Sequence, residues 1–202
     1  GDTELGFMYR ADNKWTTSLN FSIPTGSIEE EVTMMMMGME QTVRAPYPMQ
    51  LGSGTTDVIP AVTYSDEYHG MNWGFQAEYT YRTSENDAGY TLGNRSEIGA
   101  WIKWPMNKDV MLTTRMEAAR WGNISGADDQ IAQTTMMMMM PINTSPTADP
   151  NAQGGRRTDF FLGLNGMFGP HMIGAEIGVP VYQNLDGPQM ETKSIISVAY
   201  QY

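Results

Sequence analysis

Hydrophobic and polar residues alternate along most of this chain with the period of two that β-strands require. In the final stretch, 194–202, the side chains of Ile196, Val198, Tyr200 and Tyr202 share one face of an extended strand. Eight earlier stretches alternate in the same way, so the pattern predicts nine strands and an all-β fold. These stretches are 4–10, 14–23, 55–64, 72–82, 95–104, 110–120, 159–168 and 173–179.

The connections between these stretches alternate in length. Short ones cover 11–13, 65–70, 105–109 and 169–170, and long ones cover 24–54, 83–94, 122–155 and 180–192. In an up-and-down antiparallel sheet, all long connections then fall at one end. Short periplasmic turns, long extracellular loops and strands of about ten residues are typical of an outer-membrane β-barrel. A soluble sandwich also alternates and is the alternative, but the shared end of the loops and the aromatic residues near strand ends favour the membrane barrel.

The composition excludes some classes of function but does not identify one. The 202 residues include 23 acidic and 12 basic ones, for a net charge of -11, which argues against nucleic acid as a partner. Cysteine is absent, so thiolate and disulfide chemistry are excluded. No apolar run is long enough for a membrane helix.

Nine is an odd number, whereas bacterial single-chain barrels have an even number of strands. The sequence also begins without an initiator methionine, which indicates either a processed product or a fragment. We therefore expect residues 1–202 to form a single barrel domain that is the C-terminal part of a transmembrane barrel of 12 or more strands.

Several stretches resemble a known family of bacterial barrels. They are SIPTGSI (22–28 region), PYPMQLGSGT, RWGNISGADD, PTADPNAQGGRR and GVPVYQNLDGPQMET. Together they are similar to the outer-membrane transporter-like proteins of the meta-pathway phenol-degradation family, with the similarity densest from Arg120 onward. The resemblance implies a Gram-negative outer membrane, assembly by the barrel machinery that recognises an aromatic last strand, and passage of small apolar molecules. It supplies no catalytic residues.

Charged residues of both signs fall on the polar face of the predicted strands. Inside a barrel they would line the lumen, where they either tune what passes or pair across strands and plug it. They are Glu4, Arg10, Lys14, Glu78, Arg82, Arg95, Glu97, Lys103, Arg115, Glu117, Asp159 and Glu176.

Two methionine runs lie in long connections at the same predicted end. Thioether sulfur is a soft ligand that suits Cu(I), whereas the alternative is that these flexible side chains pack loops together. The candidate metal ligands are Met34, Met35, Met36, Met37 and Met39 in one loop, and Met136, Met137, Met138, Met139 and Met140 in another.

Loop carboxylates form a second candidate cation site. Oxygen ligands suit Ca²⁺, but no EF-hand spacing is present, so a solvated acidic surface that contacts lipopolysaccharide through divalent ions is the preferred interpretation. These residues are Glu29, Glu30, Glu31, Asp128, Asp129, Asp149 and Asp186. No enzyme is expected, because both histidines, His69 and His171, fall at predicted periplasmic turns, away from the loops where a barrel hydrolase would need one.

Three functions follow from these patterns. The first is a passive, porin-like channel or transporter for small solutes. The second is an anchoring subunit whose extracellular loops dock a partner protein, and the third is capture of Cu(I) by the methionine loops. Outer-membrane lipid and lipopolysaccharide are expected neighbours in all three.

Overall fold

The computed structural model describes residues 1–36, 38–132, 147–187 and 189–202. It confirms an all-β fold dominated by one antiparallel sheet of nine strands. The strands of this sheet are β1 (Thr3–Arg10), β2 (Trp15–Ile23), β5 (Asp57–Tyr68), β6 (Met71–Arg82), β8 (Arg95–Pro105), β9 (Val110–Trp121), β11 (Gly155–Phe168), β12 (His171–Leu185) and β13 (Ile195–Gln201).

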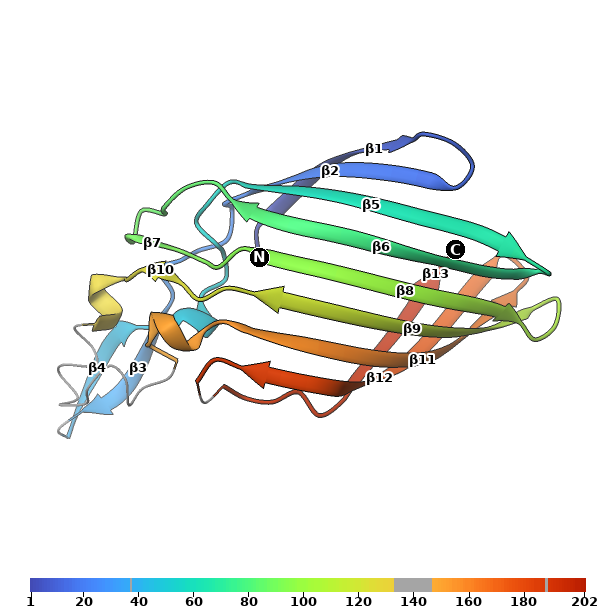
Figure 1. The fold of residues 1–202 in the computed structure, drawn as a ribbon. Coiled ribbons are helices and arrows are strands. Elements are labelled where there is room, and N and C mark those ends of the chain that lie inside the picture. Colours follow the sequence, from blue (N-terminus) through green and yellow to red (C-terminus); the bar gives the residue numbers. More distant parts are fainter. Residues whose placement is uncertain (37, 133–146, 188) are drawn as a thin grey trace.

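The nine strands pair in chain order, β1-β2-β5-β6-β8-β9-β11-β12-β13. Short turns therefore share one end of the sheet, the short-turn end, and long connections share the other, the long-loop end, as the sequence predicts. The sheet is curled: in Figure 1, β13 lies behind β8 and β9, and the start of β1 passes behind β5 and β6. Within the described residues β1 and β13 remain the two edges of an open sheet, so a closed barrel is not part of the observed architecture.

Burial along the strands is inverted relative to a soluble protein. On β11 the side chains of Leu162 and Leu164 are 45% and 54% exposed, whereas those of Asp159 and Phe161 are 5% and 4% exposed. The same alternation recurs along β6 and β12, where aromatic and aliphatic residues are exposed and the residues between them are buried or half-buried. The sheet thus has an exposed apolar face and a more enclosed polar face.

Three of the long connections carry secondary structure that the alternation did not predict. The first contains a hairpin of β3 (Glu31–Met36) and β4 (Met39–Arg44), followed by the 3-10 turn η1 (Tyr47–Met49). The second and third pair through β7 (Tyr90–Thr91) and β10 (Ser125–Gly126), and the third also contains a helical turn over 129–132 and η3 (Pro150–Ala152). Among the described residues, no helix is long and apolar enough to cross a membrane.

Three strands extend four or more residues beyond their predicted stretches, and one of them is β11, which begins at Gly155 rather than at residue 159. β5 continues to Tyr68, which reduces the connection to β6 to His69 and Gly70, and β12 continues through Pro180 to Leu185. Pro180 is accommodated because the β11–β12 register shifts beside it, between Thr158 and Asp159. A proline lacks the N–H that a ladder needs, so it is tolerated at such irregularities.

Candidate functional site

The polar face of the sheet carries eleven of the twelve predicted lumen residues. Strand register places these residues in rows, because side chains at directly paired positions share a face. Glu78 lies opposite Glu97, Gly99 opposite Glu117, and Glu117 opposite Asp159. The sheet therefore brings together carboxylates from β6, β8, β9 and β11 that are far apart in sequence.

Three neighbouring strands repeat an arginine followed two positions later by an acid on the same face. Arg95 pairs with Glu97 on β8, Arg115 with Glu117 on β9, and Arg157 with Asp159 on β11. Each arginine neutralises the carboxylate of its own strand, which offsets the repulsion between acids on adjacent strands. Arg157 was absent from the predicted set, although the repeated spacing would have identified it.

Arg115 is the most connected of these arginines. Besides Glu117 it donates to Glu176 on β12, two strands away, with an Nη2–Oε1 distance of 2.7 Å. Its guanidinium carbon lies 3.9 Å from the ring centroid of Phe161, a cation–π contact. Arg115, Glu78, Glu97 and Glu117 line a hollow of about 280 Å³ on the polar face.

Glycines on the polar face make room for two of the three large aromatic side chains there, Trp101 and Phe161, the third being Trp121. Gly74 lies opposite Trp101 and Gly178 opposite Phe161 in the strand register. A Cβ on Gly178 would lie 2.4 Å from the Phe161 ring, and one on Gly74 would lie 2.5 Å from the Trp101 ring. Aromatic side chains that cover glycines in this way help to fix strand register.

A buried polar group anchors the polar face at the long-loop end. Asp57, at the start of β5, is fully buried and forms an ion pair with Arg82, its register partner on β6. Its second oxygen accepts a hydrogen bond of 2.7 Å from the Thr55 hydroxyl. The sequence identified Arg82 but missed Asp57, although Asp57 lies within the predicted stretch 55–64.

Asp2 extends this anchor to the chain before β1. Its carboxylate accepts hydrogen bonds from the Ser53 hydroxyl at 2.6 Å and from the Gly26 amide at 2.9 Å. Partial burial would raise the pKa of Asp2, yet these hydrogen bonds hold the pKa below its ordinary value. The first long connection is thus tied to the start of β1.

Lys14 is the one predicted lumen residue that lies elsewhere. It belongs to the turn before β2, and its ammonium reaches Asp66 at 2.7 Å. The Tyr64 hydroxyl donates to the same carboxylate, and the Tyr64 ring stacks with Phe75 on the apolar face. Lys14 departs from the strand alternation because the turn, held by Asp12 accepting from the amides of residues 14 and 15, redirects it to the rim of the apolar face.

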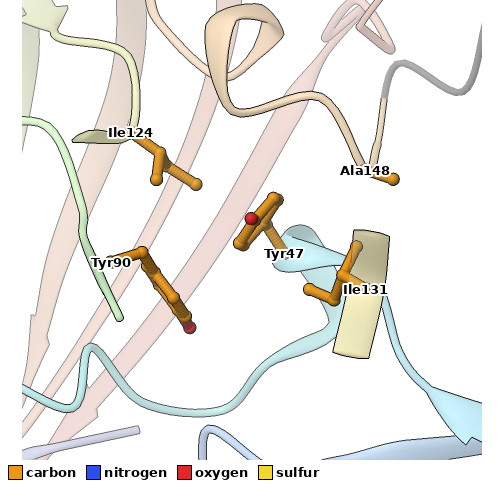
Figure 2. Packing of buried hydrophobic residues seen from close by; sticks show 5 residues of the cluster. All are labelled: Tyr47, Tyr90, Ile124, Ile131 and Ala148. Atoms are coloured by element: carbon orange, nitrogen blue, oxygen red, sulfur yellow. The ribbon is translucent and has the colours of Figure 1, made fainter. Parts of the chain in front are cut away.

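At the long-loop end the connections fold together into a compact unit, here called the loop cap. Its centre is a cluster of five buried residues drawn from three separate long connections, shown in Figure 2. They are Tyr47, Tyr90, Ile124, Ile131 and Ala148. The Tyr47 and Tyr90 rings meet edge to face with centroids 5.0 Å apart. Burial of these side chains holds the loops to one another rather than leaving them as separate solvated segments.

A buried ion pair lies beside this cluster. Arg44 at the end of β4 lies 3.4 Å from the Asp128 carboxylate, and both side chains are buried. The Tyr47 hydroxyl accepts a hydrogen bond of 3.0 Å from the Asp128 amide. The prediction of a solvated acidic surface is therefore wrong for Asp128, because the arginine compensates its charge inside the cap.

We expect the loop cap to loosen in alkaline solution. Burial raises the pKa of both Tyr47 and Tyr90 above the ordinary tyrosine value of about 10. Because the folded cap holds these phenols neutral, its stability is complete below that value and falls as the pH rises through it. Limited proteolysis of residues 84–92 and 123–132, followed against pH, should show cleavage above about pH 10. The double variant Tyr47→Phe/Tyr90→Phe should lose most of this pH dependence, whereas Tyr68→Phe, at the short-turn end, should retain it.

The other loop carboxylates are dispersed. Glu29 lies 3.7 Å from Arg44, Asp149 accepts from the Asn151 amide at the start of η3, and Asp186 accepts from the Asn123 amide group. Glu30 and Glu31 lie where the chain enters the hairpin, and Asp129 begins the helical turn. In the described part of the chain no group of three acidic or histidine side chains is placed to hold a metal ion.

The methionine candidates are only partly described. Met34 and Met35 are successive residues of β3, so they point to opposite faces of the hairpin, and Met39 pairs with Met36 across its tip. Met37 and Met136 to Met140 lie outside the described residues, so whether the two runs converge stays a prediction.

Both histidines lie at the short-turn end, as predicted. His69 occupies the β5–β6 turn with a φ of 49°, and His171 begins β12. The His171 ring is hydrogen-bonded to the Tyr200 hydroxyl at 2.8 Å and packs against Tyr202.

Comparison with known proteins adds no further constraint. No family model matches this chain, and no curated protein matches it. The function must therefore be argued from the geometry of the sheet and the loop cap.

Proposed function

We propose that this chain forms the wall of an outer-membrane β-barrel that conducts small solutes passively. The observation that carries the proposal is the inverted burial of the inner strands, in which the apolar face is exposed and the polar face is the more enclosed one. In water, so large an exposed apolar face would drive association. In a bilayer, the same face would be solvated by acyl chains while the polar face lined an aqueous interior.

The edges of the sheet must also be paired if the sheet lies in a membrane. The edge strands β1 and β13 present backbone groups that have no ladder partner in the described sheet. Such groups cost several kcal/mol each in hydrocarbon, an order of magnitude that excludes an open edge there. In the proposed functional state, the backbone groups of both edges therefore have ladder partners.

The composition of the polar face favours an open interior over a plugged one. Within each Arg-x-acid motif, the ion pair joins residues of a single strand, so these charges lie along the wall rather than across the lumen. Glycines are frequent on this face, including Gly74, Gly99, Gly163, Gly174 and Gly178. Short side chains and neutralised charges leave space for water and solute.

A second candidate function, anchoring of a partner protein, is favoured by the loop cap. A preformed folded surface binds a partner with less ordering entropy than separate flexible loops would. An anchoring barrel does not need to conduct solutes, so a conductance measurement distinguishes it from the proposed channel.

The deciding measurement is the conductance of the full-length protein in planar bilayers. Discrete openings are expected for a conduit. Replacement of Glu97 and Glu117 by glutamine should lower its cation preference, because acidic side chains on a pore wall raise the local cation concentration. Glu29→Gln, in a long connection, serves as the control and should leave selectivity unchanged. A properly inserted but silent protein would contradict the conduit and leave the anchoring function.

A further inference from the structure

One row of polar residues crosses the apolar face at the long-loop end. Strand register aligns Tyr79 with Ser96, Ser96 with Arg120, Arg120 with Arg156, and Arg156 with Asn184. The next row toward the middle of the sheet contains Ala77, Ile98, Ala118, Thr158 and Tyr182. The polar row therefore marks the border of the exposed apolar band.

The centre of this row places two like charges face to face. Arg120 and Arg156 are directly opposed on β9 and β11, and both are exposed. Directly opposed like charges destabilise an antiparallel pair unless an opposite charge lies near. Within the described residues neither guanidinium forms an ion pair, whereas four of the five arginines on the polar face, Arg82, Arg95, Arg115 and Arg157, are paired and only Arg10 is not.

Space for a ligand adjoins the two arginines. Arg120 lies between a hollow of about 590 Å³, which Tyr79, Tyr81 and Ser96 also line, and a second of about 460 Å³ that it shares with Arg156. The Arg156 guanidinium lies 5.6 Å from the Tyr182 ring centroid, which positions it at the edge of the apolar band. Asp186 also lines the second hollow, with its carboxylate accepting a hydrogen bond of 3.0 Å from Asn123.

We propose that Arg120 and Arg156 bind a phosphate group of lipopolysaccharide in the outer leaflet. Guanidinium forks match phosphate oxygens in a bidentate geometry. The anion removes the repulsion between the two arginines, and acyl chains attached to it lie along the adjoining apolar row. A free phosphate ion would gain only the first of these contributions, so the position of the pair favours a lipid-borne phosphate. This inference rests on the proposed membrane orientation, in which the long-loop end faces outward.

The test uses the full-length protein in detergent micelles and measures the binding of fluorescent lipid A by anisotropy. The double variant Arg120→Gln/Arg156→Gln should bind lipid A about tenfold more weakly, as expected for loss of charge-assisted hydrogen bonds at an exposed site. Lys108→Gln, which removes one positive charge at the short-turn end, should bind like the unmodified protein. Lipid A without its phosphates should bind equally weakly to all three.

Three results would overturn the inference. The first is that the double variant and the unmodified protein bind lipid A with equal affinity. The second is that Lys108→Gln loses as much affinity for lipid A as the double variant does. The third is that an equal concentration of inorganic phosphate displaces lipid A, which would identify a simple anion site. Failure of the proposed function is recognised separately. In that case the protein either inserts but does not conduct, or stays monomeric in water without detergent, whatever its affinity for lipid A.

Discussion

Replacement of Ala77 by lysine is expected to block stable membrane insertion, whereas the same change at the neighbouring Gln76 is expected to be tolerated. The two residues are successive positions near the middle of β6 and lie on opposite faces of the sheet. Ala77 lies between the exposed rings of Phe75 and Tyr79 on the apolar face. A lysine on the lipid face near the bilayer midplane costs about 2–4 kcal/mol, a large fraction of the stability of a typical domain.

Gln76 provides a matched control for this change. It lies opposite Gly99 and lines the hollow that contains Glu78, Glu97 and Glu117, so a lysine there meets compensating carboxylates. The fraction of protein inserted into vesicles, separated by flotation, measures both variants. Equal insertion of the two would contradict a lipid-exposed apolar face, and equal failure would mean that β6 tolerates no lysine for reasons of strand structure alone.

Much of the sheet could be predicted because its signal is local. Alternation with period two depends only on neighbouring residues, so it located all nine strands and assigned the charged residues from Glu4 to Glu176 to the correct face, with Lys14 the exception. Lys14 deviates because a turn breaks the alternation that places strand residues. Strand ends were less certain, since residues such as Asp66 near the β5 turn are polar whichever element contains them.

The loop cap could not be predicted in the same way. Its cluster joins Tyr47, Tyr90 and Ile131, which come from separate connections and show no common spacing. The same is true of Arg44 and Asp128, whose pairing depends on how two loops fold against each other. Such contacts are set by tertiary packing, for which the sequence carries no periodic signal. The Asp57–Arg82 pair lies between these cases, because strand register could have predicted it once the start of β5 and the end of β6 were known.

The loop cap and the polar face are connected through that pair. Asn86, in the second long connection, donates to the Ser53 carbonyl at 3.0 Å, and the Ser53 hydroxyl also donates to Asp2 at 2.6 Å. The Thr55 amide donates to the same Ser53 hydroxyl, and the Thr55 hydroxyl donates to Asp57 at the long-loop end of the sheet. If the first long connection moves relative to the sheet, it must therefore either break these hydrogen bonds or displace the buried, charged Asp57. We expect this anchor to keep the cap in a fixed position over the strands.

Loss of the Asp57 charge should be among the most damaging single changes in the protein. Asp57→Asn keeps the size of the side chain and an oxygen for the Thr55 hydroxyl, but leaves Arg82, which is largely buried, without its counter-charge. Removal of one partner from a buried ion pair typically costs about 3–5 kcal/mol, and Arg82→Gln should cost a similar amount by stranding the carboxylate. Urea unfolding in detergent micelles, followed by tryptophan fluorescence, measures both losses.

A double-mutant cycle separates this pairing from other effects of the substitutions. The double variant Asp57→Asn/Arg82→Gln should be no less stable than either single variant, because neither charge then remains unpaired. Lys14→Gln/Asp66→Asn provides the comparison: this exposed pair at the short-turn end has good geometry but should change stability little when removed. If the losses of Asp57→Asn and Arg82→Gln simply add, the two side chains act independently, and the anchor must depend on the Ser53, Thr55 and Asn86 hydrogen bonds instead.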